Sequence, residues 1–364
     1  GRSRSSERYR VVVRGGHSQI SVRSHMGCVM MTAKSQTLTF SSRPKITAGM
    51  SVVGEREGNG PLGGYFDTVT RDPKMGESTF EKGESVMLDN AIRGAAAKAG
   101  KDVFDIEALF AGDLLNQLVS SSYAARGLPV SYFGLYSACS TMTEALSLAA
   151  ALVNAGYYST AACATGSHFA TAERQYRYPL EYGCQRPPYA QWTVTAAGCS
   201  IIEREGDGPA ITHATIGRVV DYGIKDLNNM GAAMAPAALD TMLAVFDDTH
   251  TSAEDYDGIF TGDLGRLGGE ILRDLCRERG VELGQRYSDC GEMIFSGDQK
   301  CYSGGSGAGC SACVLNSFIL EKMRRREYDR VLLLATGALM SPTTSCQGES
   351  IPAVSHAVIL ENDI

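Results

Sequence analysis

A cysteine at a sharp turn is the residue of this chain best placed to do chemistry. Cys139 lies in GLYSACST (134–141), where a β-type segment passes into an apolar helical segment. The N-terminal backbone N–H groups of such a helix lower a thiol pKa and hold negative charge on a bound carbonyl or carboxylate. The sequence therefore predicts a nucleophile or an anion-binding site at Cys139. A buried cysteine without a role is the alternative.

The turn at Cys139 is repeated later in the chain. GLYSACST is echoed by GSGAGCSA (305–312), and the same offset places the ATG of 164–166 on the ATG of 335–337. A second pair also matches: KDVFDIEALFAGDLL and TSAEDYDGIFTGDLG, at 101–115 and 251–265. A supersecondary unit repeated once predicts two similar halves packed together.

The segments around these motifs alternate between helix and strand. A helix is predicted at 84–100, a buried strand at 105–112, a helix at 114–127, an all-apolar helix at 141–156 and a strand at 159–166. Strands that close the two sheets are expected at 193–205 and 354–363. Short buried strands between helices are typical of sheets covered on both faces. We therefore predict a duplicated, five-layered α/β/α/β/α sandwich.

The chain divides into three parts on this basis. The halves are placed at 38–208 and 209–364, and residues 1–37 are placed outside the fold. The first 26 residues are rich in Arg and Ser and lack the apolar core of a secretory signal. The excursion at 168–192 and the segment between Asp263 and Cys310 are long enough to form a pocket or an interface.

Composition excludes several classes of function. A net charge of −7 and the lack of a basic tract argue against a nucleic-acid partner. Eleven cysteines at irregular spacings fit a reducing compartment, and the single Cys310-x-x-Cys313 without clustered histidines argues against a zinc site. No segment is expected to span a membrane, because polar residues interrupt the uncharged stretch at 145–167.

At this point the motifs resemble a known family. The duplication, the Cys139 turn and GGSGAGC (304–310) resemble the thiolase superfamily, which includes the ketoacyl synthases. Four sequence segments resemble one branch of this superfamily, the stage V sporulation protein AD (SpoVAD) family: ATAERQYRYPLEYG, QRPP, TVTAAG and FTGDLGRLG. The resemblance covers about residues 38–362 and implies the duplicated thiolase fold.

Two catalytic positions of the superfamily differ in this chain. Cys139 matches the nucleophile of the condensing enzymes. Gly305, followed by Ser306, stands where their glycine-rich turn has Asn, and Gly262 or Asp263 replaces their His. Loss of one oxyanion donor costs about 100- to 1,000-fold in rate, and a carboxylate opposes enolate charge. The resemblance therefore implies a pocket adapted to binding, with no catalytic residue unless Cys139 serves as one.

Polar residues near these motifs are candidate ligand contacts. His168 ends a strand, and Arg174 and Arg177 follow in the excursion, where cationic groups suit an aromatic carboxylate. Each has an alternative: His168 as a satisfied buried side chain, and the arginines as surface or ion-paired charges. Asp113 and Asp263, also candidates, occupy equivalent places and are alternatively residues that cap the strand-to-helix turns. Cys139, Gly305 and Ser306 complete the set of candidate ligand contacts.

The family resemblance also implies a biological role. It implies a sporulation protein that binds dipicolinic acid (pyridine-2,6-dicarboxylic acid), supports its uptake into the developing spore and works with other stage V sporulation membrane proteins. A homodimer without cofactor or metal is expected, either cytoplasmic or peripheral on the spore inner membrane. Two alternatives stay open: an acyltransferase or ketoacyl synthase-like enzyme that acylates Cys139, and a scaffold for membrane proteins.

Overall fold

The structure, a computed structural model, describes residues 35–176 and 186–363 and has the predicted α/β architecture. Ten strands follow the order β11-β10-β13-β14-β9-β2-β8-β6-β4-β5. β2 (Lys45–Gly54) and β9 (Ala210–Val220) are joined only by the pair Lys45 and Ala210, so the strands form two sheets of five.

The two sheets have the same order and the same strand directions. The first contains β2 and four further strands: β5 (Ser131–Gly134), β4 (Ala108–Gly112), β6 (Thr160–Ser167) and β8 (Ala196–Glu203). The second contains β9 and their counterparts: β11 (Tyr287–Asp289), β10 (Gly258–Thr261), β13 (Arg330–Ala338) and β14 (Ala353–Glu361). In each sheet four strands run in the same direction, and one strand, β8 in the first sheet and β14 in the second, runs antiparallel to them. The predicted duplication is therefore confirmed; the boundary at residue 208 stays a prediction.

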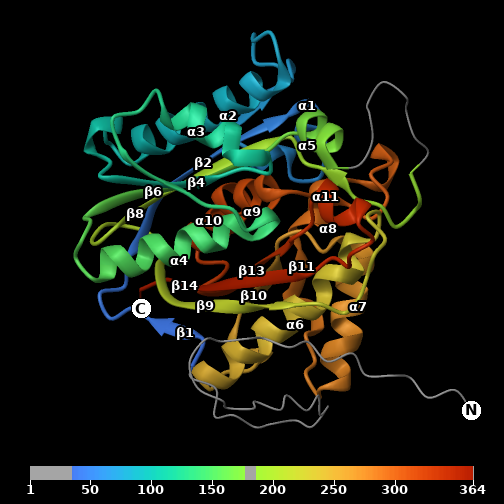
Figure 1. Ribbon diagram of the computed structural model, residues 1–364. Coiled ribbons are helices and arrows are strands. Elements are labelled where there is room, and N and C mark those ends of the chain that lie inside the picture. The colour runs from blue at the N-terminus through green and yellow to red at the C-terminus, as the bar shows by residue number, and fades with distance from the viewer. Residues whose placement is uncertain (1–34, 177–185, 364) are drawn as a thin grey trace, which may run out of the picture. The chain divides into compact units, whose positions relative to one another are not determined.

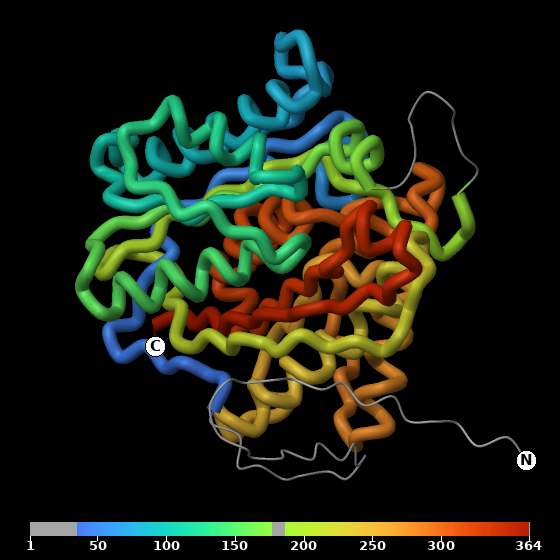
Figure 2. The backbone as a smooth tube through the Cα atoms, in the orientation of Figure 1, coloured from blue at the N-terminus to red at the C-terminus, as the bar shows by residue number. Residues whose placement is uncertain are grey.

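Helices form the other three layers of the sandwich, as Figure 1 shows. α2 (Phe80–Lys98) and α3 (Val119–Ala125) cover the outer face of the first sheet. α6 (Met230–Thr249) and α7 (Gly265–Glu278) cover the outer face of the second. Between the sheets lie α4 (Thr141–Asn154), α9 (Ala308–Val314) and α10 (Leu320–Arg324), the last two joined by a π-helical turn. The tube in Figure 2 shows the same five layers.

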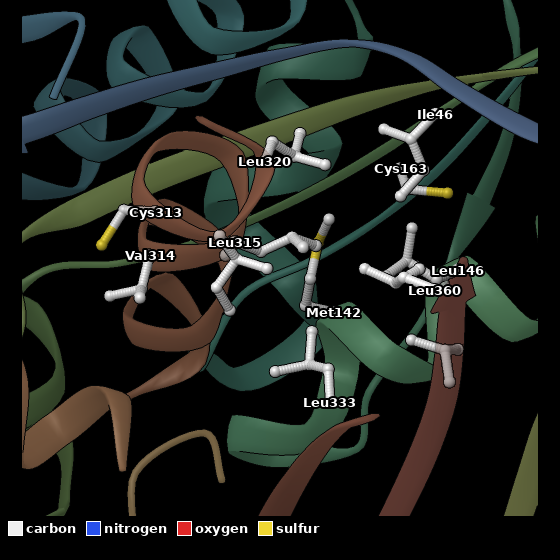
Figure 3. Packing of buried hydrophobic residues seen from close by; sticks show 14 of the residues in the cluster. Ile46, Met142, Leu146, Cys163, Cys313, Val314, Leu315, Leu320, Leu333 and Leu360 are labelled. Atoms are coloured by element: carbon white, nitrogen blue, oxygen red, sulfur yellow. The ribbon is translucent and has the colours of Figure 1, made fainter. Parts of the chain in front are cut away.

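The largest core cluster fills the middle layer. α4 supplies Met142 and Leu146, and the π-helical turn supplies Leu315, all fully buried (Figure 3). They meet Leu333 of the second sheet and Cys163 of the first. The all-apolar composition of 141–156 predicted this burial, because a helix without a polar face has to be covered on all sides.

Shorter elements complete the described part of the chain. They are β1 (Thr37–Thr39), α1 (Glu55–Gly58), β3 (Thr68–Thr70), α5 (Phe169–Tyr176), β7 (Trp192–Thr193), α8 (Cys290–Ile294), β12 (Gly305–Ser306) and α11 (Pro342–Cys346). β7 pairs in parallel with β12, which ties the end of the first-half excursion to the glycine-rich turn. No helix among residues 35–176 and 186–363 is long and apolar enough to cross a bilayer.

Two predicted elements are divided in the structure. The helix expected at 114–127 begins only at Val119, because Gln117 and Leu118 have left-handed backbone angles, with φ of 56° and 55°. The strand expected at 193–205 is divided into β7 and β8. Thr195 lies between them, and its N–H donates to the Glu57 carboxylate at 3.0 Å.

Candidate functional site

The Cys139 turn is built on a strained backbone. Ala138 has φ of 49°, which a residue with a Cβ adopts only when its surroundings enforce it. A short 3₁₀ turn, Ala138–Ser140, then leads into α4. The Thr141 hydroxyl fixes it by donating to the Ala138 carbonyl at 2.7 Å and accepting from the Ser137 N–H at 3.1 Å. The Cys139 side chain therefore has one defined position, and it is buried.

A buried histidine of the second half braces this turn. Nδ1 of His356 accepts from the Gly217 N–H at 3.2 Å, so Nε2 carries the proton and lies 3.2 Å from the Ser137 hydroxyl. Burial lowers the pKa of His356 to about 4, which keeps the ring neutral. Our sequence analysis missed His356. Its only signal is a polar residue within the apolar strand VSHAVIL.

Asp263 is a buried carboxyl group next to Cys139. Its carboxylate lies beside the Cys139 thiol, while Oδ2 accepts from the Gly307 N–H at 2.8 Å and from the Ser306 hydroxyl at 3.2 Å. A Cβ at the neighbouring Gly262 would instead point at Ala335 and Ser311, 3.1 and 3.3 Å away.

The electrostatics of the Cys139–Asp263 pair are the reverse of those of an activated thiol. Burial raises the pKa of Asp263 to about 7. Burial, and then the charge of Asp263, raise the pKa of Cys139 well above its ordinary value. The expected lowering of this pKa by the helix N-terminus does not occur, because the thiol is desolvated and faces a carboxyl group. Cys139 is therefore a protonated thiol.

The glycine-rich turn presents Ser306 to the cavity and turns Gly305 away from it. A Cβ at Gly305 would lie 2.7 Å from Val194 Cγ2 and 2.8 Å from Ile294 Cγ2, inside the apolar core. An asparagine at 305 therefore has no room and does not face the thiol. Ser306 lines the cavity in its place and is bonded to Asp263.

A narrow, mostly apolar cavity of about 30 Å³ opens beside Cys139. Tyr136 and Tyr176 stand in its wall with their hydroxyl oxygens 2.8 Å apart, and the Tyr176 hydroxyl donates to the Leu114 carbonyl. Among the described residues, no Lys or Arg lines the cavity. Its lining consists of Leu114, Tyr136, Ala138, Cys139, Ala172, Tyr176, Thr193, Met230, Ser306, Ala338 and Met340.

The symmetric partner of Asp263 has a different function. Asp113 accepts from the Leu115 N–H at 2.8 Å and from the N–H and hydroxyl of Ser121, each at 2.7 Å, so it holds the turn before α3. The equivalent turn in the second half is held by Asp289, which accepts from the Leu264 and Gly265 N–H groups. The turn-holding interpretation therefore fits Asp113 but not Asp263.

The other predicted contacts lie away from the cavity. His168 is buried with both ring nitrogens engaged: Nε2 lies 2.8 Å from the Pro73 carbonyl, and Nδ1 accepts from the Ala170 N–H. Arg174 is half-exposed and lies 3.6 Å from the Glu81 carboxylate. Arg177 is outside the described residues. The structure thus brings Cys139, Asp263 and Ser306 together and places His168, Arg174 and Asp113 elsewhere.

The described residues contain no group of three or more His, Cys, Asp or Glu side chains placed to hold a metal ion. Cys310 and Cys313, which have C-x-x-C spacing, are both fully buried in α9, and the Cys313 thiol lies 3.3 Å from the Cys310 carbonyl. Both thiols are therefore part of the core packing between the sheets.

The duplicated sandwich and its cysteine turn define a thiolase-like protein. Solved structures of condensing enzymes have this fold. One is 3-oxoacyl-(acyl carrier protein) synthase III from Aquifex aeolicus, at 12% identity, 88% coverage of this chain, 100% of that chain and a TM-score of 0.54. Another is an OleA variant from Xanthomonas campestris, at 15% identity, 91% and 100% coverage and a TM-score of 0.59. At these identities the likeness establishes the fold alone.

Within that class the chain belongs to the stage V sporulation protein AD (SpoVAD) family. The family model matches residues 34–361. Stage V sporulation protein AD of Bacillus subtilis (strain 168) is 42% identical over 326 residues, covering 90% of this chain and 96% of that protein. The family resemblance read from the sequence is thus confirmed.

Proposed function

We propose that this sporulation-family protein binds dipicolinic acid in the cavity beside Cys139 and supports its uptake into the developing spore. The observation that carries the proposal is the pairing of Cys139 with Asp263. A condensing enzyme needs a thiolate and donors to the thioester oxygen, whereas this site has a protonated thiol beside a carboxyl group. The pocket is retained, and the groups that would make it catalytic are replaced.

The cavity wall suits a small, flat aromatic ligand. Tyr136 and Tyr176 offer ring faces and hydroxyl groups, and Met230 and Met340 offer flexible thioether chains on other parts of the wall. Because the free volume is small, a bound ring requires the methionines to change rotamer. A ligand carboxylate would accept a hydrogen bond from the Tyr136 hydroxyl, since the Tyr176 hydroxyl already donates to the Leu114 carbonyl.

Calorimetry with dipicolinate tests this proposal directly. We expect saturable binding, accompanied by a change in the fluorescence of Trp192, the only tryptophan and the neighbour of Thr193 in the cavity wall. Tyr136→Phe keeps the ring and removes the hydroxyl, so it should weaken binding about tenfold. Tyr157→Phe, at an exposed position, is the matched control. Absence of saturable binding to the wild type would refute the proposal.

The enzyme alternative is tested on the same preparation. The Cys139 turn keeps the strained backbone and helix start of an acyl-accepting cysteine. An acyltransferase or ketoacyl synthase would give a covalent adduct with acetyl-CoA or malonyl-CoA, seen as a mass increase that Cys139→Ser abolishes. We expect no adduct, because burial and the Asp263 carboxyl raise the pKa of the thiol and so oppose formation of the nucleophilic thiolate.

Partners and location are also part of the proposal. Other stage V sporulation membrane proteins would hold this chain, cytoplasmic or peripheral, at the spore inner membrane. If the chain were only a scaffold, cavity variants would leave uptake of dipicolinic acid unchanged in sporulating cells.

A homodimer through β5 is proposed as well. β5 pairs with β4 only among the described strands, and all four of its residues are exposed, so its outer edge is open to a second copy. Light scattering should give a dimer mass for the wild type and a monomer mass for Ser131→Lys, because a charge on an edge strand opposes pairing. A monomeric wild type would contradict this.

A further inference from the structure

Asp263 is placed so that its protonation can affect the binding of an anion in the cavity. Its side chain is fully buried next to the Cys139 thiol, and its Oδ1 atom has no hydrogen-bond partner in the described part of the chain. Cys139 and Ser306, which both contact Asp263, line the cavity. An anion bound there therefore sits close to a carboxyl group across a dry wall, where two negative charges repel strongly.

The surroundings of Asp263 leave no other means of neutralising it. The groups that act on its carboxyl are the Gly307 N–H and the Ser306 hydroxyl of the glycine-rich turn, the Cys139 thiol before α4, and Asp289 at the end of β11. The buried thiols of Cys290 in α8 and Cys310 in α9 also face it. None of these groups is a cation.

From this arrangement we infer that the cavity takes up its carboxylate ligand together with one proton, which Asp263 holds. The inference rests on the proposed binding function and adds its regulation by pH. Since burial already raises the pKa of Asp263 to about 7, the group is neutral below that pH and the ligand binds without proton uptake. Above about pH 7 the Asp263 carboxyl of the free protein is ionised and has to take up a proton when the ligand binds. Affinity should then fall about tenfold per pH unit.

Calorimetry in paired buffers of different ionisation enthalpy counts this proton. We expect the wild type to take up almost none per dipicolinate at about pH 6 and close to one at about pH 8.5. Asp263→Asn should bind dipicolinate without proton uptake at both pH values. At about pH 8.5 it should bind dipicolinate more tightly than the wild type. Asp113→Asn, at the symmetric carboxyl outside the cavity, is the matched control and should keep the wild-type proton count.

A second variant keeps the test independent of whether Asp263→Asn folds. The Ser306 hydroxyl lowers the pKa of Asp263, so Ser306→Ala should move the fall in affinity to higher pH. Binding by the wild type without proton uptake at any pH would overturn the inference and leave the proposed function standing. Proton uptake that persists in Asp263→Asn would overturn it as well. Absence of binding at every pH would overturn the proposed function itself.

Discussion

Replacing Asp263 with Asn should stabilise the protein at neutral and alkaline pH. The amide has the shape of the carboxyl, so its oxygen still accepts from the Gly307 N–H and the Ser306 hydroxyl. Its NH₂ group then takes the place of Oδ1, which has no hydrogen-bond partner among the described residues. The substitution removes a buried ionisable group without leaving a cavity.

The magnitude follows from the pKa of the carboxyl. Asp263 has a pKa of about 7 in the folded protein against an ordinary value of 3.8. At 1.36 kcal/mol per pKa unit, the difference gives about 4 kcal/mol. An acid with a raised folded pKa binds its proton more tightly in the folded state, so the folded protein loses this amount as pH rises from about 4 to about 7. The advantage of the variant should therefore be near zero at about pH 4 and about 4 kcal/mol, as an upper bound, above about pH 7.

Urea unfolding followed by Trp192 fluorescence measures the difference. The free energy of unfolding would be compared between wild type and variant at about pH 5 and about pH 8. A gap that widens with pH supports the buried carboxyl as described. A gap that stays constant, or a variant less stable than the wild type at about pH 8, would refute the reasoning, because either result means that Asp263 is ionised and well solvated at neutral pH.

Three further predictions concern residues around Cys139 and the glycine-rich turn. Gly305→Asn should lower the free energy of unfolding by about 2–5 kcal/mol and give no condensing activity. Gly64→Asn is the control and should cost little, because no atom lies within 4 Å of a Cβ built there. Urea unfolding measures both variants. As pH falls from about 6.5 to about 4, His356 is protonated in the unfolded chain but not in the folded protein, so the wild type loses stability. His356→Gln should not show this loss, and unfolding measured at the two pH values tests it. A thiol reagent at about pH 8 should label the exposed Cys346 fast and Cys139 slowly, as peptide mass mapping would show, and equal rates would contradict the raised Cys139 pKa.

The repeat made the fold predictable from the sequence. The two matched pairs of segments fix which strands are equivalent, and the largely apolar helix at 141–156 has to lie between layers. These are properties of hydrophobic pattern and spacing, which survive without knowledge of side-chain orientation. The cysteine turn was predictable for the same reason, since a strand, a turn and a helix follow one another directly.

The cavity could not be predicted in the same way. Its wall combines Leu114, Tyr136, Thr193, Met230 and Ala338, which are far apart in the sequence and meet only through the packing of both halves. Nearness along the chain was misleading for polar residues, because α5 directs its side chains to different places. Tyr176 of this helix lines the cavity, whereas Arg174, two residues earlier, lies beside Glu81.

Backbone geometry at the glycine-rich turn decides which residue of the turn faces the cavity. Gly304 and Gly307 have φ of 108° and 119°, values that favour glycine, and they set the direction in which Gly305 and Ser306 point. A motif alignment assigns the lost asparagine to Gly305, yet that position faces the core and its neighbour faces the thiol. Side-chain direction over a single residue step depends on φ and ψ, which sequence spacing does not specify.

The strained Cys139 turn makes sense in a binding protein as well as in an enzyme. Holding Ala138 at φ of 49° costs about 1–3 kcal/mol, and in a condensing enzyme such strain positions a thiolate. Here the same turn supplies Ala138 and Cys139 to the cavity wall and places the thiol beside Asp263. Relaxing the turn would move both residues and let water reach the carboxyl, which would lower its pKa toward the ordinary value. We infer that the strain keeps Asp263 dry, and in our proposal the dry carboxyl opposes thiolate formation and links anion binding to a proton.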